Sequence, residues 1–191
     1  MHSPIAGTVI ALALMLPGCA TPEQKLAAAS NVSTVDDQFN PHRQYRTGAI
    51  KSSFNESVAV GNYETQLMAE VDRKTGASGA GLQFTIRYTA NLQRKYQEAR
   101  NANAENLAVH SVVHHASDCS KKLGSCTYLE AVIIDLPVAG LRSAGNQGYP
   151  IKLFPKIGQG IELAIPKSLI TSLFDGVDAG EKHVAAAQQM P

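Results

Sequence analysis

Hydrophobic and polar residues alternate through much of the middle and C-terminal part of the chain. In the run Gly81–Tyr88, four hydrophobic residues alternate with three polar ones. A period of two places the two sets on opposite faces of a β-strand. The run 64–72 alternates in the same way, and Asp72–Gly76 between the two runs is typical of a turn. The pattern therefore predicts a β-hairpin.

Two more pairs of strands are predicted further along the chain. Residues 106–115 and 127–136 flank a polar segment that contains Gly124, which indicates a second hairpin. Residues 150–154 and 160–165 alternate on either side of a turn rich in proline and glycine. Several strands joined by hairpins favour two antiparallel sheets packed face to face. We therefore expect an all-β, antiparallel two-sheet sandwich.

The remaining segments lack this alternation. Residues 166–176 change to a helical period, so we expect one short C-terminal helix over Lys167–Phe174, closed by Gly176. The polar interval 94–105 shows no apolar stripe, and we expect an exposed loop there. The predicted domain spans residues 47–180. Residues 181–191 are expected to form a flexible tail.

The N-terminus has the features of an export signal. An uncharged apolar run, Ile5–Leu16, is too short to span a bilayer and is typical of a secretory signal. It ends in Leu16-Pro17-Gly18-Cys19, which resembles the lipobox of bacterial lipoproteins. That resemblance implies a signal peptide over residues 1–18, fatty acyl chains such as palmitate on Cys19, and a polar tether over residues 19–46. Ala20 after the cysteine resembles the pattern sorted to the outer membrane, facing the periplasm.

Two alternatives remain for this segment. One is an ordinary signal peptide with an incidental cysteine, and the other is a buried N-terminal helix. The residues before the apolar run, Met1-His2-Ser3, contain no Lys or Arg, whereas secretory signals usually carry positive charge there.

The cysteine count agrees with export and lipidation. The chain has three cysteines, so lipidation of Cys19 leaves Cys119 and Cys126 as a pair. They bracket the turn of the second predicted hairpin, where opposed residues come within reach of a disulfide. Neither cysteine opens a predicted helix, so we interpret the pair as a structural disulfide and not as a redox centre.

The candidates for chemistry are His110, His114 and His115, with carboxylates nearby in sequence. On a helix, His110 and His114 would converge on one metal ion, but on a strand the same spacing separates them by about 13 Å. If Cys119 faces Cys126, antiparallel counting places His115 opposite Glu130 and His110 opposite Asp135. We expect cross-strand contacts on exposed sheet surface, and no metal, cofactor or catalytic residue.

Other functional patterns are weaker. The segment Gly76–Ala80 approximates the nucleophile elbow of serine hydrolases, but a strand follows it where that motif needs a helix. A net charge of +1 without a basic block argues against a nucleic-acid partner. The cysteine-bracketed hairpin, the segment Tyr128–Pro137 and the strand–helix unit Ile161–Phe174 resemble small exported bacterial proteins of unassigned function, a likeness that implies no activity.

The sequence leaves three hypotheses open. The leading one is a non-enzymatic envelope protein that is anchored to the membrane by lipid and acts by contact with a protein partner. The others are a binding module for a small ligand or envelope polymer, and a hydrolase or metal-binding protein that uses the histidine group.

Overall fold

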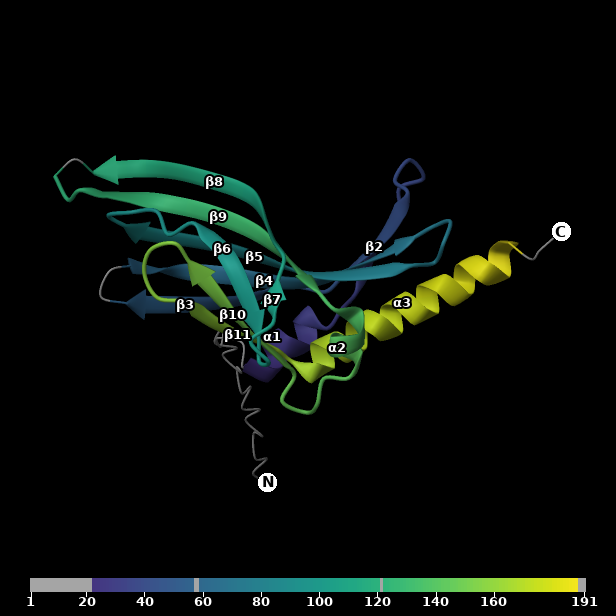
Figure 1. Cartoon of the computed structure of the whole chain (residues 1–191). Coiled ribbons are helices and arrows are strands. Elements are labelled where there is room, and N and C mark those ends of the chain that lie inside the picture. Colours follow the sequence, from purple (N-terminus) through teal and green to yellow (C-terminus); the bar gives the residue numbers. More distant parts are fainter. Residues whose placement is uncertain (1–21, 57–58, 121, 189–191) are drawn as a thin grey trace, which may run out of the picture.

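The chain folds into two antiparallel β-sheets and a long C-terminal helix (Figure 1). The computed structural model describes residues 22–56, 59–120 and 122–188. The predicted all-β sandwich is confirmed. Among the described residues, no helix is long and apolar enough to cross a membrane. The signal peptide and Cys19 lie outside the described residues.

The larger sheet has seven strands in the order β1-β2-β4-β5-β9-β8, and β3 pairs with β4 beside β2. Their bounds are β1 Ser33–Val35, β2 His42–Arg46, β3 Ile50–Glu56, β4 Ala59–Asp72, β5 Ser78–Ala90, β8 Val109–Ser120 and β9 Ser125–Leu136. The smaller sheet has the order β11-β10-β6-β7. Its strands are β6 Tyr96–Asn101, β7 Asn106–Leu107, β10 Tyr149–Pro155 and β11 Ile161–Ile165. The helices are α1 Pro22–Ala29, α2 Val138–Arg142 and α3 Lys167–Gln188.

The core follows from the alternation in the sequence. Leu67, Leu82 and Ile134 are aligned across β4, β5 and β9, and all three are buried. The same face of the sheet carries a row of buried aromatic and aliphatic residues that packs against the smaller sheet. Each such side chain contributes roughly 1.5–3 kcal/mol when it is fully buried. All three predicted hairpins are present, as β4–β5, β8–β9 and β10–β11.

The predicted exposed loop over residues 94–105 is wrong. It contains β6, which lies beside β10 and buries Tyr96 and Ala99. The pairing of β6 shifts at Pro155, so that Tyr96 pairs with Pro155 and Glu98 with Phe154. This irregularity breaks the period of two that would reveal a strand.

Residues 22–46 are part of the fold, unlike the tether that we expected there. They form α1, β1 and β2, and β2 pairs with β4 in the larger sheet. Tyr45 and Arg43 are buried, although β2 has only one hydrophobic residue. The Arg43 guanidinium is paired with Asp36 and Glu181, which allows a charged side chain to occupy an inner position. This pairing is invisible in a hydrophobicity pattern.

The C-terminal helix is much longer than predicted. The first turns match the expected helix, but α3 continues through Gly176 to Gln188 and includes much of the expected flexible tail. Its glycines serve close packing and not termination. A Cβ at Gly176 would lie 2.9 Å from the side chain of Val32, and one at Gly180 would lie 2.4 Å from the hydroxyl of Tyr45. Next to Gly180, Glu181 accepts hydrogen bonds from Arg43 at 2.6 Å and Tyr45 at 2.7 Å.

The docking of α3 predicts a reversal of the usual effect of a helix substitution. Gly→Ala in an exposed helix interior normally stabilises by about 1 kcal/mol. We expect Gly180→Ala to destabilise the protein instead, by about 1–3 kcal/mol, because the added methyl group overlaps the buried Tyr45 ring. Chemical denaturation measures the change. In a Tyr45→Phe background, which lacks the nearest atom, the penalty should shrink, and stabilisation by Gly180→Ala in the parent chain would contradict the docking.

Candidate functional site

The β8–β9 hairpin carries most of the residues that the sequence singled out. The disulfide between Cys119 and Cys126 is present and closes the tip of the hairpin. Closing a loop of this length contributes roughly 2–3 kcal/mol in the chain-entropy model. The bond holds the two strands together at the end farthest from α2, where, among the described strands, β8 pairs with β9 alone.

The expected register of this hairpin is wrong by one residue at its centre. Ser120 pairs with Ser125, but His114, and not His115, pairs with Glu130. Register shifts lie between Ser117 and Ser120 and between Ser111 and Val113. Asp118 at the first shift has a φ of 47°, a left-handed conformation that Asp tolerates better than most residues. Each β-bulge inserts one residue, and counting back from the cysteines cannot detect it.

The three histidines therefore have different surroundings. His115 pairs with Leu129. His110 Nε2 lies 2.8 Å from Asp135 Oδ2, as the sequence indicated, although the two residues are diagonal neighbours and not direct partners. Both of those side chains are exposed, so the contact contributes little to stability. Among the described residues, no group of three His, Cys, Asp or Glu side chains is placed to hold a metal ion.

Glu130 is the centre of a buried polar cluster between the two sheets. Its side chain is fully buried on β9 and accepts a hydrogen bond from the hydroxyl of Tyr88. It also accepts hydrogen bonds from the backbone amides of Lys95 at 3.1 Å and Tyr96 at 3.2 Å. These amides belong to the segment that enters β6, so one carboxylate connects the two sheets.

Arg94 completes this cluster from the same segment. Its backbone amide donates to the Tyr88 hydroxyl at 2.6 Å, and its guanidinium donates to the Tyr96 hydroxyl at 3.0 Å and forms an ion pair with Glu56. The guanidinium also lies over the rings of Phe54 and Tyr88. This buried cation therefore has an anionic partner and two aromatic faces.

Burial controls the ionisation of this cluster. It raises the pKa of Tyr96 to about 12 and raises the pKa of Tyr88 further, with a contribution from the Glu130 carboxylate. Burial opposes the charge of Arg94, but the hydrogen bonds to Glu56 and Tyr96 outweigh it and raise the pKa of the guanidinium. Both phenols are therefore neutral and the arginine is a cation throughout the physiological range, so that Tyr88 donates to Glu130 and Tyr96 accepts from Arg94.

A serine and a histidine lie on the solvent side of the buried Glu130 carboxylate. Ser111 Oγ lies 2.6 Å from His114 Nε2, and His114 Nδ1 lies 3.4 Å from Glu130 Oε2. The bulge at residues 111–113 places Ser111 and His114, three residues apart, on the same face of β8. The side-chain amide of Gln93 also lies 3.4 Å from His114 Nδ1. The arrangement has the order of a Ser–His–acid triad, in which the histidine takes a proton from the hydroxyl.

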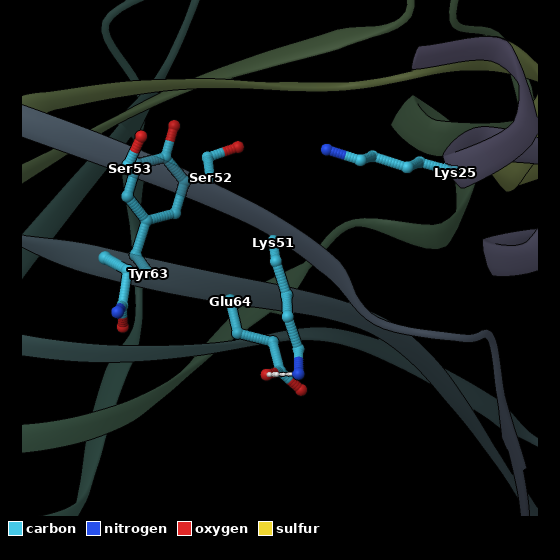
Figure 2. A pocket seen from close by; sticks show the side chains of 7 residues that line it. Lys25, Lys51, Ser52, Ser53, Tyr63 and Glu64 are labelled. Atoms are coloured by element: carbon cyan, nitrogen blue, oxygen red, sulfur yellow. Dashed lines mark ion pairs between the residues drawn. The ribbon is translucent and has the colours of Figure 1, made fainter. Parts of the chain in front are cut away.

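A polar pocket of about 680 Å³ lies at a different place, beside the free edge of β3. Lys25 of α1, Lys51, Ser52 and Ser53 of β3, and Asn62, Tyr63 and Glu64 of β4 line it. Figure 2 shows Lys25 extending across the pocket toward the side that carries Ser52, Ser53 and Tyr63. Lys51 forms an ion pair with Glu64 at 3.7 Å.

Residue 48 sets the position of α1 beside this pocket. The amide of Gly48 donates to the carbonyl of Ala29 at 2.8 Å, which ties the end of α1 to the start of β3. A Cβ at residue 48 would lie 2.8 Å from the Cα of Ala29, so the approach requires glycine. The backbone thus fixes the helix that carries Lys25.

Comparison with known proteins identifies no relative. No family model, curated protein or solved structure matches the chain.

Sequence reasoning identified the histidines and Glu130 but missed Ser111, Tyr88, Arg94 and Tyr96. One signal was available: Glu130 occupies an inward position in an otherwise apolar run, which indicates a buried and paired carboxylate. Its partners come from a segment more than 30 residues away and from across a β-bulge, and spacing along the chain does not indicate them. Ser78 of the apparent nucleophile elbow begins β5, so that motif has no strand–turn–helix setting.

The Glu130 cluster predicts a large effect of an isosteric substitution. We expect Glu130→Gln to lower the free energy of unfolding by about 3–5 kcal/mol. Three donors face the two carboxylate oxygens, and the substitution replaces one of these oxygens by an NH₂ group that cannot accept a hydrogen bond. Glu98→Gln is the matched control, since Glu98 is exposed and paired with Arg100, and it should change stability by less than about 1 kcal/mol. Equal effects in denaturant titrations would contradict the proposed connection between the sheets.

Proposed function

We propose that this protein is a lipid-anchored component of the bacterial cell envelope that acts by contact with another protein, in envelope structure or assembly. The lipobox-like Leu16–Cys19 and the odd number of cysteines support the anchor. The disulfide at the β8–β9 tip supports an oxidising compartment such as the periplasm.

The N-terminal fold supports a position close to the membrane surface. Helix α1 begins at Pro22, only three residues after Cys19. Three residues of extended chain span at most about 11 Å. A protein lipidated at Cys19 therefore has its folded part almost in contact with the lipid headgroups, without the long tether that the sequence indicated.

The observation that carries the protein-contact function is the free edge of β8. The strand has 12 residues and pairs with β9 on one side only. Val112 and Val113 at its centre are 57% and 37% exposed. An exposed edge strand presents unpaired backbone groups that an extended segment of a partner can continue as an added strand. Between the two bulges, Val113–Ser117 keep a regular register and offer such a template.

This proposal predicts a discrete cross-linked partner at the β8 edge. A photo-reactive residue at position 112 should give one cross-linked product in intact cells, and Val113→Lys should reduce it at least tenfold because a charge blocks strand addition. Position 60 is the control, since Val60 is 56% exposed but lies on β4, which is paired on both sides. A product that contains two copies of this chain, or products of equal yield at both positions, would contradict a separate partner.

The anchor has its own readout in the same cells. Metabolic labelling with a fatty-acid analogue should mark the parent protein and leave Cys19→Ser unlabelled. The cross-link at position 112 should then weaken in Cys19→Ser, because the domain is no longer held at the membrane. Equal labelling of both proteins would refute lipidation at Cys19.

The Ser111–His114–Glu130 geometry favours a second candidate function, an acyl hydrolase. Ser111 would attack an ester carbonyl and transfer its proton to His114 Nε2, which then protonates the leaving alcohol; water releases the acyl group by the same route. Two observations place this function second. Three donors already occupy the Glu130 carboxylate, and Gln93 shares its approach to His114 Nδ1.

The two candidates differ in their response to a fluorophosphonate probe. The hydrolase predicts covalent labelling of Ser111 that is lost in Ser111→Ala and in His114→Gln. Ser117→Ala, the matched control on the same strand, should keep the label. Envelope contact without catalysis predicts no labelling of any of these proteins. Labelling that survives Ser111→Ala would exclude this triad as its origin.

A further inference from the structure

A smaller hollow between the two sheets adjoins the polar pocket beside β3. The inner hollow has a volume of about 140 Å³, and Ser52 and Tyr63 line both spaces. Its other walls are mostly apolar: Ile50, Thr65, Leu82, Glu162, Leu163, Ala164, Ile165, Pro166 and Leu169. We call the polar pocket the mouth and the apolar hollow the chamber; Ser52 and Tyr63 form the wall that they share.

The mouth offers several polar groups to a ligand. In the described part of the chain, the ammonium of Lys25 and the hydroxyls of Ser52, Ser53 and Tyr63 have no hydrogen-bond or ion-pair partner. The carboxylate of Glu64 offsets only Lys51, which leaves the mouth with a net positive charge. An ammonium group and several hydroxyls supply more donors than a single carboxylate can use, and they match the three oxygens of a phosphate group.

The chamber limits the apolar part of the ligand. A cavity of about 150 Å³ lined by aliphatic side chains accommodates a benzene-sized group. The one carboxylate on its wall, Glu162, is paired with Lys152 at 2.8 Å and so does not repel an incoming anion strongly. A hydrocarbon group of about six carbons therefore fits.

We propose that the mouth and the chamber bind a phosphate-bearing amphiphile, with the phosphate at the ammonium of Lys25 and the hydroxyls of Ser52 and Tyr63 (Figure 2) and a short apolar group between Ser52 and Leu163. This binding goes beyond the proposed envelope contact and requires neither lipidation of Cys19 nor the β8 edge. Two classes of ligand carry such a phosphate group: phospholipids, in their headgroup region, and free phosphate esters. Lys25 lies six residues from Cys19, so about 20 Å of chain at most separates it from the anchor.

Calorimetric titration of the full chain with Cys19→Ser, which removes the attached lipid, tests the site. Hexyl phosphate should bind at least about tenfold more tightly than inorganic phosphate, hexanol or hexanoate, since only it fills both spaces. Lys25→Gln should lose at least about tenfold in affinity for hexyl phosphate. Lys51→Gln is the matched control, because it changes the net charge equally but Lys51 points toward Glu64 and away from Lys25 (Figure 2), and it should bind like the parent.

The passage between mouth and chamber has a separate test. Ser52→Phe should remove the preference for hexyl phosphate over inorganic phosphate, and Tyr63→Phe, which keeps the ring, should weaken both about equally. Thermal midpoints of these variants identify any that fail to fold, in which case Tyr63→Phe carries the test. Absence of hexyl phosphate binding, hexanoate binding of equal strength, or equal losses in Lys25→Gln and Lys51→Gln would overturn the proposal.

Vesicles distinguish the two sources. The Cys19→Ser chain should co-sediment with phosphatidylglycerol vesicles, and not with phosphatidylcholine vesicles, if the ligand is a membrane lipid, and Lys25→Gln should abolish this. Hexyl phosphate binding without co-sedimentation assigns the site to a soluble phosphate ester. Lipidation of Cys19 is measured independently by fatty-acid labelling, so failure of the anchor and failure of this site give different results.

Discussion

A buried carboxylate without partners is among the most costly groups in a protein interior, and Glu130 places this constraint on the whole sandwich. Its acceptors are satisfied by a tyrosine of β5 and by two backbone amides at the entry to β6. If the smaller sheet moved away, these donors would leave and the carboxylate would remain in an apolar space. The relative position of the two sheets is therefore determined by hydrogen bonds as well as by the non-directional packing of the core.

The same constraint explains the unusual backbone beside Glu130. Lys95 has a φ of 56°, a left-handed conformation that costs a residue other than glycine about 1 kcal/mol or more. Its amide and that of Tyr96 both point at the carboxylate as a result. The hydrogen bonds to a buried acceptor offset the strain, and Arg94, held between Glu56 and two aromatic rings, keeps the segment in place.

The sequence predicted the elements whose energetics depend on burial of one face. The three hairpins, the sandwich and the disulfide followed from alternation and cysteine spacing, because hydrophobic burial acts on each residue by its own type. Three features depended on pairwise interactions between distant residues instead. The burial of Arg43 requires Glu181, the path of β6 requires Glu130, and the extension of α3 requires glycines that face Val32 and Tyr45. A single sequence contains no local signal for these pairs.

The candidate site shows the same division on a smaller scale. Counting from Cys119 and Cys126 placed the histidines on the correct strand and beside carboxylates, but two inserted residues decide which histidine faces inward. Without the bulge at residues 111–113, strict alternation would put Ser111 and His114 on opposite faces of β8. With this bulge, both side chains face Glu130, and Val112 and Val113 stay exposed on the edge strand. The bulge thus divides the side chains of β8 into two sets. The polar set contacts the buried cluster, and the apolar set is open to a partner.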